Sequence, residues 1–176
     1  MAHDASWLKE HIRDVPDFPE PGIVYRDITP LLGHADACRF AVDAIADHFA
    51  GVTVDRVVAV EARGFLFGVP VAYRLGVGFA PARKPGKLPY EVERQEYELE
   101  YGSDAVEMHR DAVSPGERVL VVDDLLATGG TAAAAVALVE RLGGEVVGLG
   151  FVVELTALGG RRQLGDRELC ALVTYD

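Results

Sequence analysis

Two adjacent carboxylates, Asp123 and Asp124, stand next to a turn of small residues that can bind an anion. The turn consists of Ala127, Thr128, Gly129, Gly130 and Thr131. Its small side chains allow successive backbone N–H groups to converge on one ligand. A sugar phosphate suits this combination, because its hydroxyls can donate to the acids while the turn binds the phosphate. The alternative is an ordinary strand-to-helix turn with two acids near the start of the helix.

The segments on either side of this turn predict a strand and a helix. Val119 to Val122 is an apolar, mostly β-branched run, typical of a buried strand in a parallel sheet, and the acid pair is expected to follow its end. Ala132 to Leu142 (AAAAVALVERL) has high helix propensity and one apolar face. The positively polarised N-terminus of such a helix would point at the same anion.

A second unit of the same kind carries an arginine. Arg56 to Glu61 (RVVAVE) is another candidate for a buried strand, and a helix is expected from Phe65 to Leu75. Arg63 lies in the turn between them, at the carboxyl end of a parallel strand, where ligands bind in open α/β sheets. Its forked guanidinium suits a pyrophosphate, and the alternative is an ion pair with Glu61.

A basic segment follows a third predicted parallel strand, Gly78 to Arg83. Arg83, Lys84 and Lys87 lie close together in a chain whose formal net charge is −11. An anionic substrate would need such a local positive patch against the overall acidic field. Short basic clusters are also common in solvated loops, so this alternative stays open.

The other predicted elements surround this centre. They are a helix from Ser6 to Asp14 with Ser6 as its N-cap, a proline-stiffened covering segment at about 15–34, a helix from Ala35 to Phe49, a polar hairpin at about 84–113, a strand from Glu145 to Val153, a helical turn from Gly159 to Leu164 and an edge strand from Glu168 to Tyr175. In the covering segment Arg26 and Asp27 are expected to pair, and Tyr25 would stack on a flat ligand or make a core or dimer contact.

Length and composition fit one α/β domain spanning residues 1–176. The chain is 49% hydrophobic, and its mean hydropathy is +0.14. The acidic balance argues against nucleic acid as a partner. No apolar stretch is long enough for a membrane span or a signal peptide, so we expect a cytoplasmic protein. Cys38 and Cys170 lack the spacing of a zinc site or a disulfide framework and are expected to be buried as small hydrophobes.

These motifs together resemble the phosphoribosyltransferases of the type I fold, whose signature is a hydrophobic strand, two acids and a T-G-G-T or related loop. The variant DDLLATGGT is similar to that of the members that act on adenine. EARGFLFG resembles the pyrophosphate loop of this family, RKPGKLP its basic segment, IVYRDI its hood and LEYGS its L-E-Y-G segment. The resemblance extends from Phe18 to Val173.

The resemblance implies a fold and a reaction. The fold would be a central, mostly parallel sheet flanked by helices, with an N-terminal hood at about 15–34 and a flexible β-hairpin flap at about 84–113. The reaction would transfer the phosphoribosyl group of phosphoribosyl pyrophosphate to N9 of adenine and give AMP and pyrophosphate. The resemblance further implies Mg²⁺ as the cofactor, held mainly through substrate and water, and a homodimer.

Roles for individual residues follow from the resemblance as well. The catalytic residues would be Glu100, which manages protons of the purine imidazole ring, and Asp123 and Asp124, which orient the ribose. The substrate-binding residues would be Val24 and Arg26 through their backbone, Tyr25 against the base, Arg63, Arg83 and Lys87 on the pyrophosphate, Tyr101 beside Glu100, the turn from Ala127 to Thr131 on the 5′-phosphate, and Leu155 on the second face of the base. A cis peptide is expected between Glu61 and Ala62.

Three other classes of protein share part of this pattern. Phosphoribosyltransferases for hypoxanthine, guanine or orotate use a different hood, often with a lysine that is not found in IVYRDI. A regulator that senses phosphoribosyl pyrophosphate would usually need an added DNA-binding segment. A P-loop hydrolase or a dinucleotide-binding fold is disfavoured, because neither GxxxxGK[ST] nor GxGxxG after a strand is present.

Overall fold

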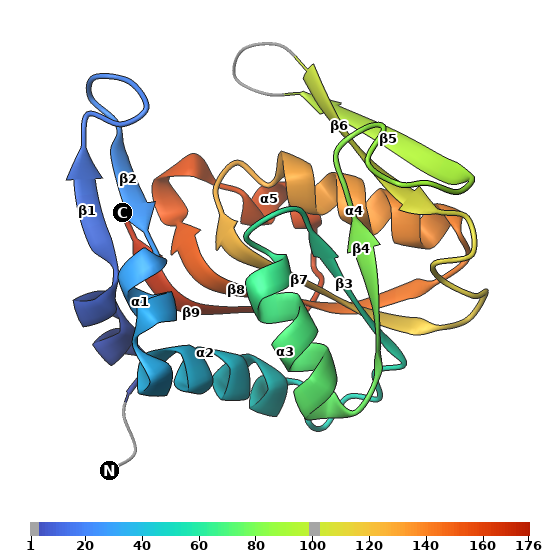
Figure 1. The fold of residues 1–176 in the computed structure, drawn as a ribbon, viewed down its shortest axis with the longest axis horizontal. Helices are drawn as coiled ribbons and strands as arrows, with labels where there is room; N and C mark the ends of the chain where they lie inside the picture. Colours follow the sequence, from blue (N-terminus) through green and yellow to red (C-terminus); the bar gives the residue numbers. More distant parts are fainter. Residues whose placement is uncertain (1–3, 99–102) are drawn as a thin grey trace.

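A five-stranded sheet forms the centre of the computed structural model, which describes residues 4–98 and 103–176 (Figure 1). The strands are β3 (Arg56–Val60), β4 (Gly78–Ala82), β7 (Arg118–Leu126), β8 (Glu145–Leu155) and β9 (Leu169–Tyr175). Their order is β4-β3-β7-β8-β9, and every neighbouring pair is parallel. The predicted α/β class with a mostly parallel sheet is confirmed, and β9 is the edge strand that the sequence predicted.

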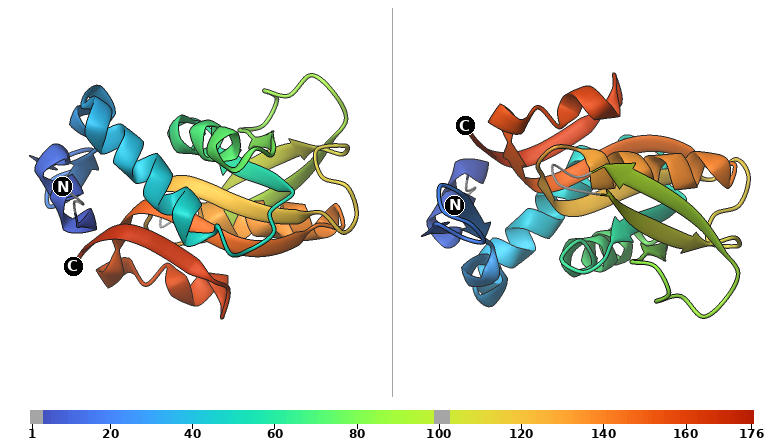
Figure 2. Two further views of the ribbon diagram at one scale, coloured as in Figure 1. Left: turned by 90° about the horizontal axis from the view of Figure 1, so that it is seen from below. Right: turned by 90° about the horizontal axis from the view of Figure 1, so that it is seen from above.

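Helices cover both faces of this sheet, which explains why its strands are apolar on both sides (Figure 2). One face packs against α2 (Ala35–His48) and α3 (Phe65–Leu75), and the other packs against α4 (Gly130–Arg141) and α5 (Arg161–Leu164). Alternate strand residues enter the two cores: Leu120 and Val122 belong to the first, and Val119 and Val121 to the second.

The N-terminal segment differs from the predicted helix. A 3₁₀ helix, η1 (Ala5–His11), ends early, and β1 (Arg13–Pro16) then pairs antiparallel with β2 (Val24–Asp27) ahead of a short helix, α1 (Thr29–Gly33). The expected Arg26–Asp27 ion pair is wrong. Neighbouring strand residues point to opposite faces, so Arg26 pairs across the hairpin with Asp14, while Asp27 pairs with Arg13.

The predicted flap is a hairpin of two antiparallel strands, β5 (Val92–Glu98) and β6 (Ser103–His109), that packs beside α4 (Figure 1). Between β8 and α5 lies a single 3₁₀ turn, η2 (Thr156–Leu158). Both cysteines are free. Cys170 is buried as expected, whereas Cys38 is only half-buried. In the described ranges, no helix is both long and apolar enough to cross a membrane.

Two boundaries near the acid pair also differ from the prediction. The strand does not end before Asp123 but continues to Leu126, because β7 keeps pairing with β8 as far as Leu126 and Glu154. The following helix begins at Gly130 rather than Ala132, so two residues of the turn already belong to its first turn. The acids therefore sit on a rigid sheet and not on a loop.

Candidate active site

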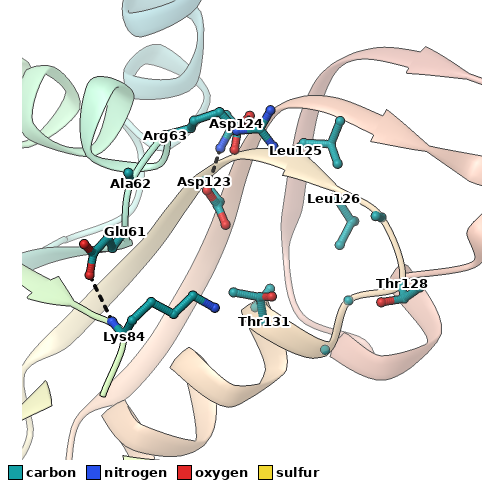
Figure 3. Close-up of a pocket in the computed structure, with 14 residues that line it drawn as sticks. Glu61, Ala62, Arg63, Lys84, Asp123, Asp124, Leu125, Leu126, Thr128 and Thr131 are labelled. Atoms are coloured by element: carbon teal, nitrogen blue, oxygen red, sulfur yellow. Dashed lines mark hydrogen bonds and ion pairs between the residues drawn. The ribbon is translucent and has the colours of Figure 1, made fainter. Parts of the chain in front are cut away.

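A pocket opens at the carboxyl ends of β3 and β7, where the two strand-turn-helix units meet (Figure 3). It is lined by Glu61, Ala62, Arg63, Lys84, Asp123, Asp124, Leu125, Leu126, Ala127, Thr128, Gly129, Gly130, Thr131 and Ala132. The structure thus brings the acid pair, the small-residue turn and Arg63 into one cavity. This is the edge of a parallel sheet at which α/β proteins bind ligands.

Of the acid pair on the floor of this pocket, Asp124 is buried and Asp123 is half-buried. Asp124 is 4% exposed, and in the described part of the chain its Oδ2 atom accepts no hydrogen bond. Asp123 Oδ1 accepts the backbone N–H of Asp124 at 2.9 Å. Burial, and then the charge of Asp124, raise the pKa of Asp123 well above its usual range; burial also raises the pKa of Asp124, although Arg63 opposes the shift.

Gly64 allows this close approach of the two strand-turn-helix units. A Cβ atom at this position would lie 2.6 Å from the Val60 carbonyl oxygen and 2.7 Å from Asp123 Oδ1. Any larger residue would push α3 away from the acid pair. The EARG segment therefore needs a glycine at this position, because the first turn of α3 lies too close to Asp123 for a side chain.

The turn from Ala127 to Thr131 joins β7 to α4. Gly129 has φ 89° and ψ −7°, a left-handed conformation that glycine adopts without a steric penalty. Gly130 then starts the helix, whose first N–H groups have no partner within the helix. The turn and the first residues of α4 line the pocket, so these N–H groups and the positive end of the helix dipole are suited to an anion.

Arg63 crosses from the β3 unit to the β7 unit. Its Nε atom lies 3.1 Å from Asp124 Oδ2, within ion-pair distance but without hydrogen-bond geometry. Its Nη1 donates to the Tyr25 hydroxyl, and the guanidinium lies 5.3 Å from the centre of the Tyr25 ring. Arg63 therefore does not pair with Glu61. It links the hood to the acid pair.

Glu61 instead organises the basic segment. It accepts from Arg83 Nε at 3.2 Å, from Arg83 Nη2 at 3.0 Å and from the backbone N–H of Lys84 at 3.0 Å. These hydrogen bonds, that from the Arg83 guanidinium above all, lower the pKa of Glu61. Arg83 and Lys87 do not line the pocket, and Arg83 Nη1 donates to the Lys87 carbonyl at 3.1 Å. The structure thus places both residues beside the pocket.

Lys84 extends into the cavity towards the start of α4 (Figure 3). Its Nζ donates to the Tyr97 hydroxyl at 2.9 Å and to Asp104, both on the flap hairpin. Burial opposes the charge of Lys84, but these two hydrogen bonds and the charges of their acceptors together raise the lysine pKa. The flap is therefore tied to the pocket through a cation.

The hood residues lie at the edge of the site. Tyr25 reaches it through Arg63, and Val24 is 44% exposed on β2. The Arg26 guanidinium pairs with Asp14 and stacks on Tyr175 at 4.0 Å, so its side chain contacts neither acid of the pocket. Leu155 is half-buried at the end of β8 and does not line the pocket. Glu100 and Tyr101 lie outside the described residues, and their roles stay predictions.

Sequence reasoning left Glu61, Lys84 and Asp104 out of the site. Lys84 belonged to the recognised basic segment, so a signal was present. Asp104 carried none, because it is one acid in a polar hairpin and its partner is 20 residues away in the sequence. The Glu61–Ala62 peptide is cis, as the resemblance implied. Among the residues that the structure describes, no cluster of three or more His, Cys, Asp or Glu side chains could hold a metal ion.

Comparison with known proteins agrees with this geometry. Residues 25–169 match the family model of the phosphoribosyl transferase domain. The adenine phosphoribosyltransferase of Thermobifida fusca is 57% identical over 175 residues, covering 99% of each chain. The crystal structure of adenine phosphoribosyltransferase from Thermoanaerobacter pseudethanolicus superposes with a TM-score of 0.94 at 52% identity, over 97% of this chain and 99% of that one.

A third relative was solved with ligands. The adenine phosphoribosyltransferase of Saccharomyces cerevisiae, complexed with an imino-altritol bisphosphate and adenine, has a TM-score of 0.90 at 42% identity, over 96% of this chain and 98% of that one. The fold and the pocket thus define a phosphoribosyltransferase of the type I fold, and the chain belongs to that family. Within the family it belongs with the adenine phosphoribosyltransferases.

Proposed function

We propose that the protein transfers the phosphoribosyl group of phosphoribosyl pyrophosphate to N9 of adenine, which gives AMP and pyrophosphate. The observation that carries this proposal is the union of the acid pair and the anion-binding turn in one pocket, on a chain that matches adenine phosphoribosyltransferases over almost its full length. In this reaction the bond from C1′ to the pyrophosphate oxygen breaks, and its electron pair leaves with pyrophosphate. The lone pair of N9 forms the new bond, and the N9 proton is lost.

The acid pair would bind the ribose. Asp124 Oδ2 lacks a hydrogen-bond donor within the described residues, and a ribose hydroxyl would supply one. As the C1′–O bond breaks, positive charge develops on the sugar ring. Two carboxylates held out of water, with raised pKa values, would stabilise that charge more strongly than hydrated carboxylates do.

The remaining groups would hold the two phosphate ends. The turn from Ala127 to Thr131 binds the 5′-phosphate, while Arg63 and Lys84 face the pyrophosphate, with Arg83 and Lys87 next to them. Tyr25 would contact the base, and its hydrogen bond from Arg63 connects it to the pocket. Glu100 is assigned to the imidazole protons on the family resemblance alone, and Glu100→Gln should lower turnover; unchanged turnover would refute that role.

Mg²⁺ is part of this proposal. The carboxylates that line the described pocket are Glu61, Asp123 and Asp124, and we expect the ion to be held mainly by substrate oxygens and water. When bound, Mg²⁺ would neutralise charge on the departing pyrophosphate.

We also propose a homodimer in the cytoplasm. On α3, Leu66, Val69 and Tyr73 are 45%, 47% and 89% exposed, and beside them Leu32, Cys38 and Val42 form an apolar groove. A second copy is the partner we expect on this face. The two free thiols fit a reducing compartment. Light scattering on a sizing column tests the dimer; a monomer at micromolar concentration would contradict it.

One assay tests the reaction. Purified protein, Mg²⁺ and phosphoribosyl pyrophosphate are incubated in parallel with adenine, hypoxanthine, guanine and orotate, and nucleotide is separated and quantified. We expect AMP from adenine and little or no product from the other bases. Absence of AMP would refute the proposed function, and equal rates with hypoxanthine or guanine would refute its specificity for adenine.

A further inference from the structure

The anion-binding turn is held from behind by a segment that does not line the pocket. Gly160 precedes α5, and a Cβ atom on it would lie 2.3 Å from the Ala127 carbonyl oxygen and 3.1 Å from the Gly129 backbone nitrogen. A Cβ atom on Gly129 would in turn lie 2.5 Å from the Gly160 carbonyl oxygen. The two backbones are therefore in direct contact, and the position of Gly160 limits where the turn can lie.

An ion pair between the buried Glu154 carboxylate and the half-exposed Arg161 guanidinium fixes Gly160 in place. The next residue, Arg161, donates through Nε to Glu154 Oε1 at 2.7 Å and to Oε2 at 2.9 Å, and through Nη2 to Oε2 at 2.7 Å. Glu154 is 4% exposed. It lies on β8 opposite Leu126, the last residue of β7 before the turn. The pair therefore ties the start of α5 to the strand that neighbours the turn.

Neither charge of this pair faces the proposed ligand. Glu154 and Arg161 do not line the pocket, and the Glu154 carboxylate pairs with Arg161. Burial of a carboxylate costs free energy unless a cation pairs with it in good hydrogen-bond geometry. A forked guanidinium on both carboxylate oxygens gives a defined orientation, which one ammonium group would not.

We propose that Glu154 and Arg161 are positioning residues for the anion-binding turn. The pair holds Gly160 against Ala127 and Gly129, and so sets the direction of the turn's N–H groups and the affinity for the 5′-phosphate, without contact with the ligand. This inference rests on the proposed function for the identity of that phosphate. It predicts a selective effect on ligands that carry a 5′-phosphate, which adenine does not.

Two variants test the inference by different routes. Arg161→Lys keeps the charge next to Glu154 but loses the fork, and Gly160→Ala places a methyl group against the turn. We expect each to raise the KM for phosphoribosyl pyrophosphate and the Kd for AMP by roughly tenfold, as displacement of a binding group from a distance does. The Kd for adenine should change less than about twofold, since the base lacks the phosphate.

Matched controls separate positioning from general stability. Arg56→Lys removes a fork of the same kind, in which Nε and Nη2 lie 2.9 and 2.8 Å from the two oxygens of Glu117, at the opposite end of the sheet. Gly51→Ala adds a methyl group where nothing lies within 4 Å. Both should leave the KM for phosphoribosyl pyrophosphate unchanged, even if Arg56→Lys lowers the Tm.

The outcomes are distinct. An unchanged donor KM in Arg161→Lys, despite a lowered Tm, would overturn the inference. An equal rise in the adenine and AMP constants would overturn it too, because it would indicate general loss of structure. Wild-type protein that forms no AMP would refute the proposed function instead, and binding of ribose 5-phosphate to the same four variants would then decide the inference.

Discussion

The carboxylates at the ends of β3 and β7 lie on adjacent parallel strands, at the same edge of one sheet, yet their pKa values shift in opposite directions. Glu61, at the end of β3, is satisfied by Arg83 and by the backbone of Lys84, and its pKa is lowered. Asp123 on β7 is desolvated beside Asp124, and its pKa is raised. Glu61 is thus hydrogen-bonded to protein groups in the free protein, whereas Asp124 Oδ2 has an ion pair with Arg63 but no hydrogen-bond donor among the described residues.

The carboxylates of the two strands therefore have different functions. Glu61 stabilises the fold and positions the basic segment, so its charge is already paired with protein groups before a substrate binds. The acids on β7 destabilise the free protein and, in the proposed reaction, stabilise a cationic sugar ring. Groups of this kind in active sites commonly lower the stability of the free protein.

The largest effect is expected for Asp123→Asn. Loss of the charge should lower kcat by about 10²–10³-fold, as the loss of one electrostatic contact to a transition state does. The same variant should be more stable without ligand, since it removes a half-buried negative charge beside Asp124; a gain of about 1 kcal/mol raises the Tm by about 2–4 °C. Steady-state AMP formation and calorimetry of the free protein measure the two effects. A lowered Tm would contradict the division proposed above.

Arg63→Lys tests the link between the two units. Lysine cannot reproduce the guanidinium that reaches both Asp124 and the Tyr25 hydroxyl. We expect kcat/KM for phosphoribosyl pyrophosphate to fall by roughly 10–100-fold, since a single ammonium group cannot make both contacts. Titration of both substrates measures it, and a change confined to adenine would show that Arg63 serves the hood alone.

Glu61→Gln should affect stability more than catalysis. The variant loses charged hydrogen bonds to Arg83 at a site that is 20% exposed, and we expect a loss of about 1 kcal/mol and a Tm lower by about 2–4 °C. Glu96→Gln is the control, because its pair with Arg94 is mostly exposed and such pairs contribute little. Equal Tm values for the two variants would show that the contacts of Glu61 contribute no more to stability than an exposed ion pair does.

The smallest effect is a pH dependence of these stabilities. The folded pKa of Asp123 is raised, so its unfavourable contribution to the free energy of unfolding is present at neutral pH, shrinks as pH falls below that pKa and is gone below the unfolded value of about 3.9. The folded pKa of Glu61 is lowered, so its favourable contribution is present above the unfolded value of about 4.3 and is lost as pH falls through the folded pKa.

Thermal unfolding of both variants across pH 7 to 4 follows these signs. The stability gain of Asp123→Asn should shrink as pH falls from 7 towards 4, whereas the deficit of Glu61→Gln should persist to below about pH 4.3 before it closes. A gain of Asp123→Asn that grew with acidity would contradict the raised pKa of Asp123.

The main features of the fold followed from the sequence because they depend on local pattern. Apolar runs such as Val119 to Val122 and the alanine-rich helix after the turn have few alternatives to a buried strand and a helix. Features set by pairing between distant segments did not follow. Strand β7 runs on through the acids because β8 lies beside it, and Arg26 pairs with Asp14 because a hairpin forms where a helix was expected.

The same limit applies to the site. Motifs with fixed spacing, such as the acid pair and the ATGGT turn, were placed correctly in one pocket. Ion-pair partners that are far apart in the sequence were not predicted. Lys84 pairs with Asp104 of the flap, and Arg63 pairs with Asp124 rather than with the nearby Glu61. The sequence shows which charges are present, while the fold decides which of them remain unpaired.

The position of β7 in the middle of the parallel sheet also bears on how the protein folds. Its partner β3 is far away in the sequence, and the ion pair from Arg56 to Glu117 closes a gap of 61 residues. Parallel pairing over such distances carries a high loop-closure entropy and is slow compared with helix formation. During refolding, helical signal should recover before the capacity to bind AMP, so nucleotide binding would report on the last contacts of the chain to form.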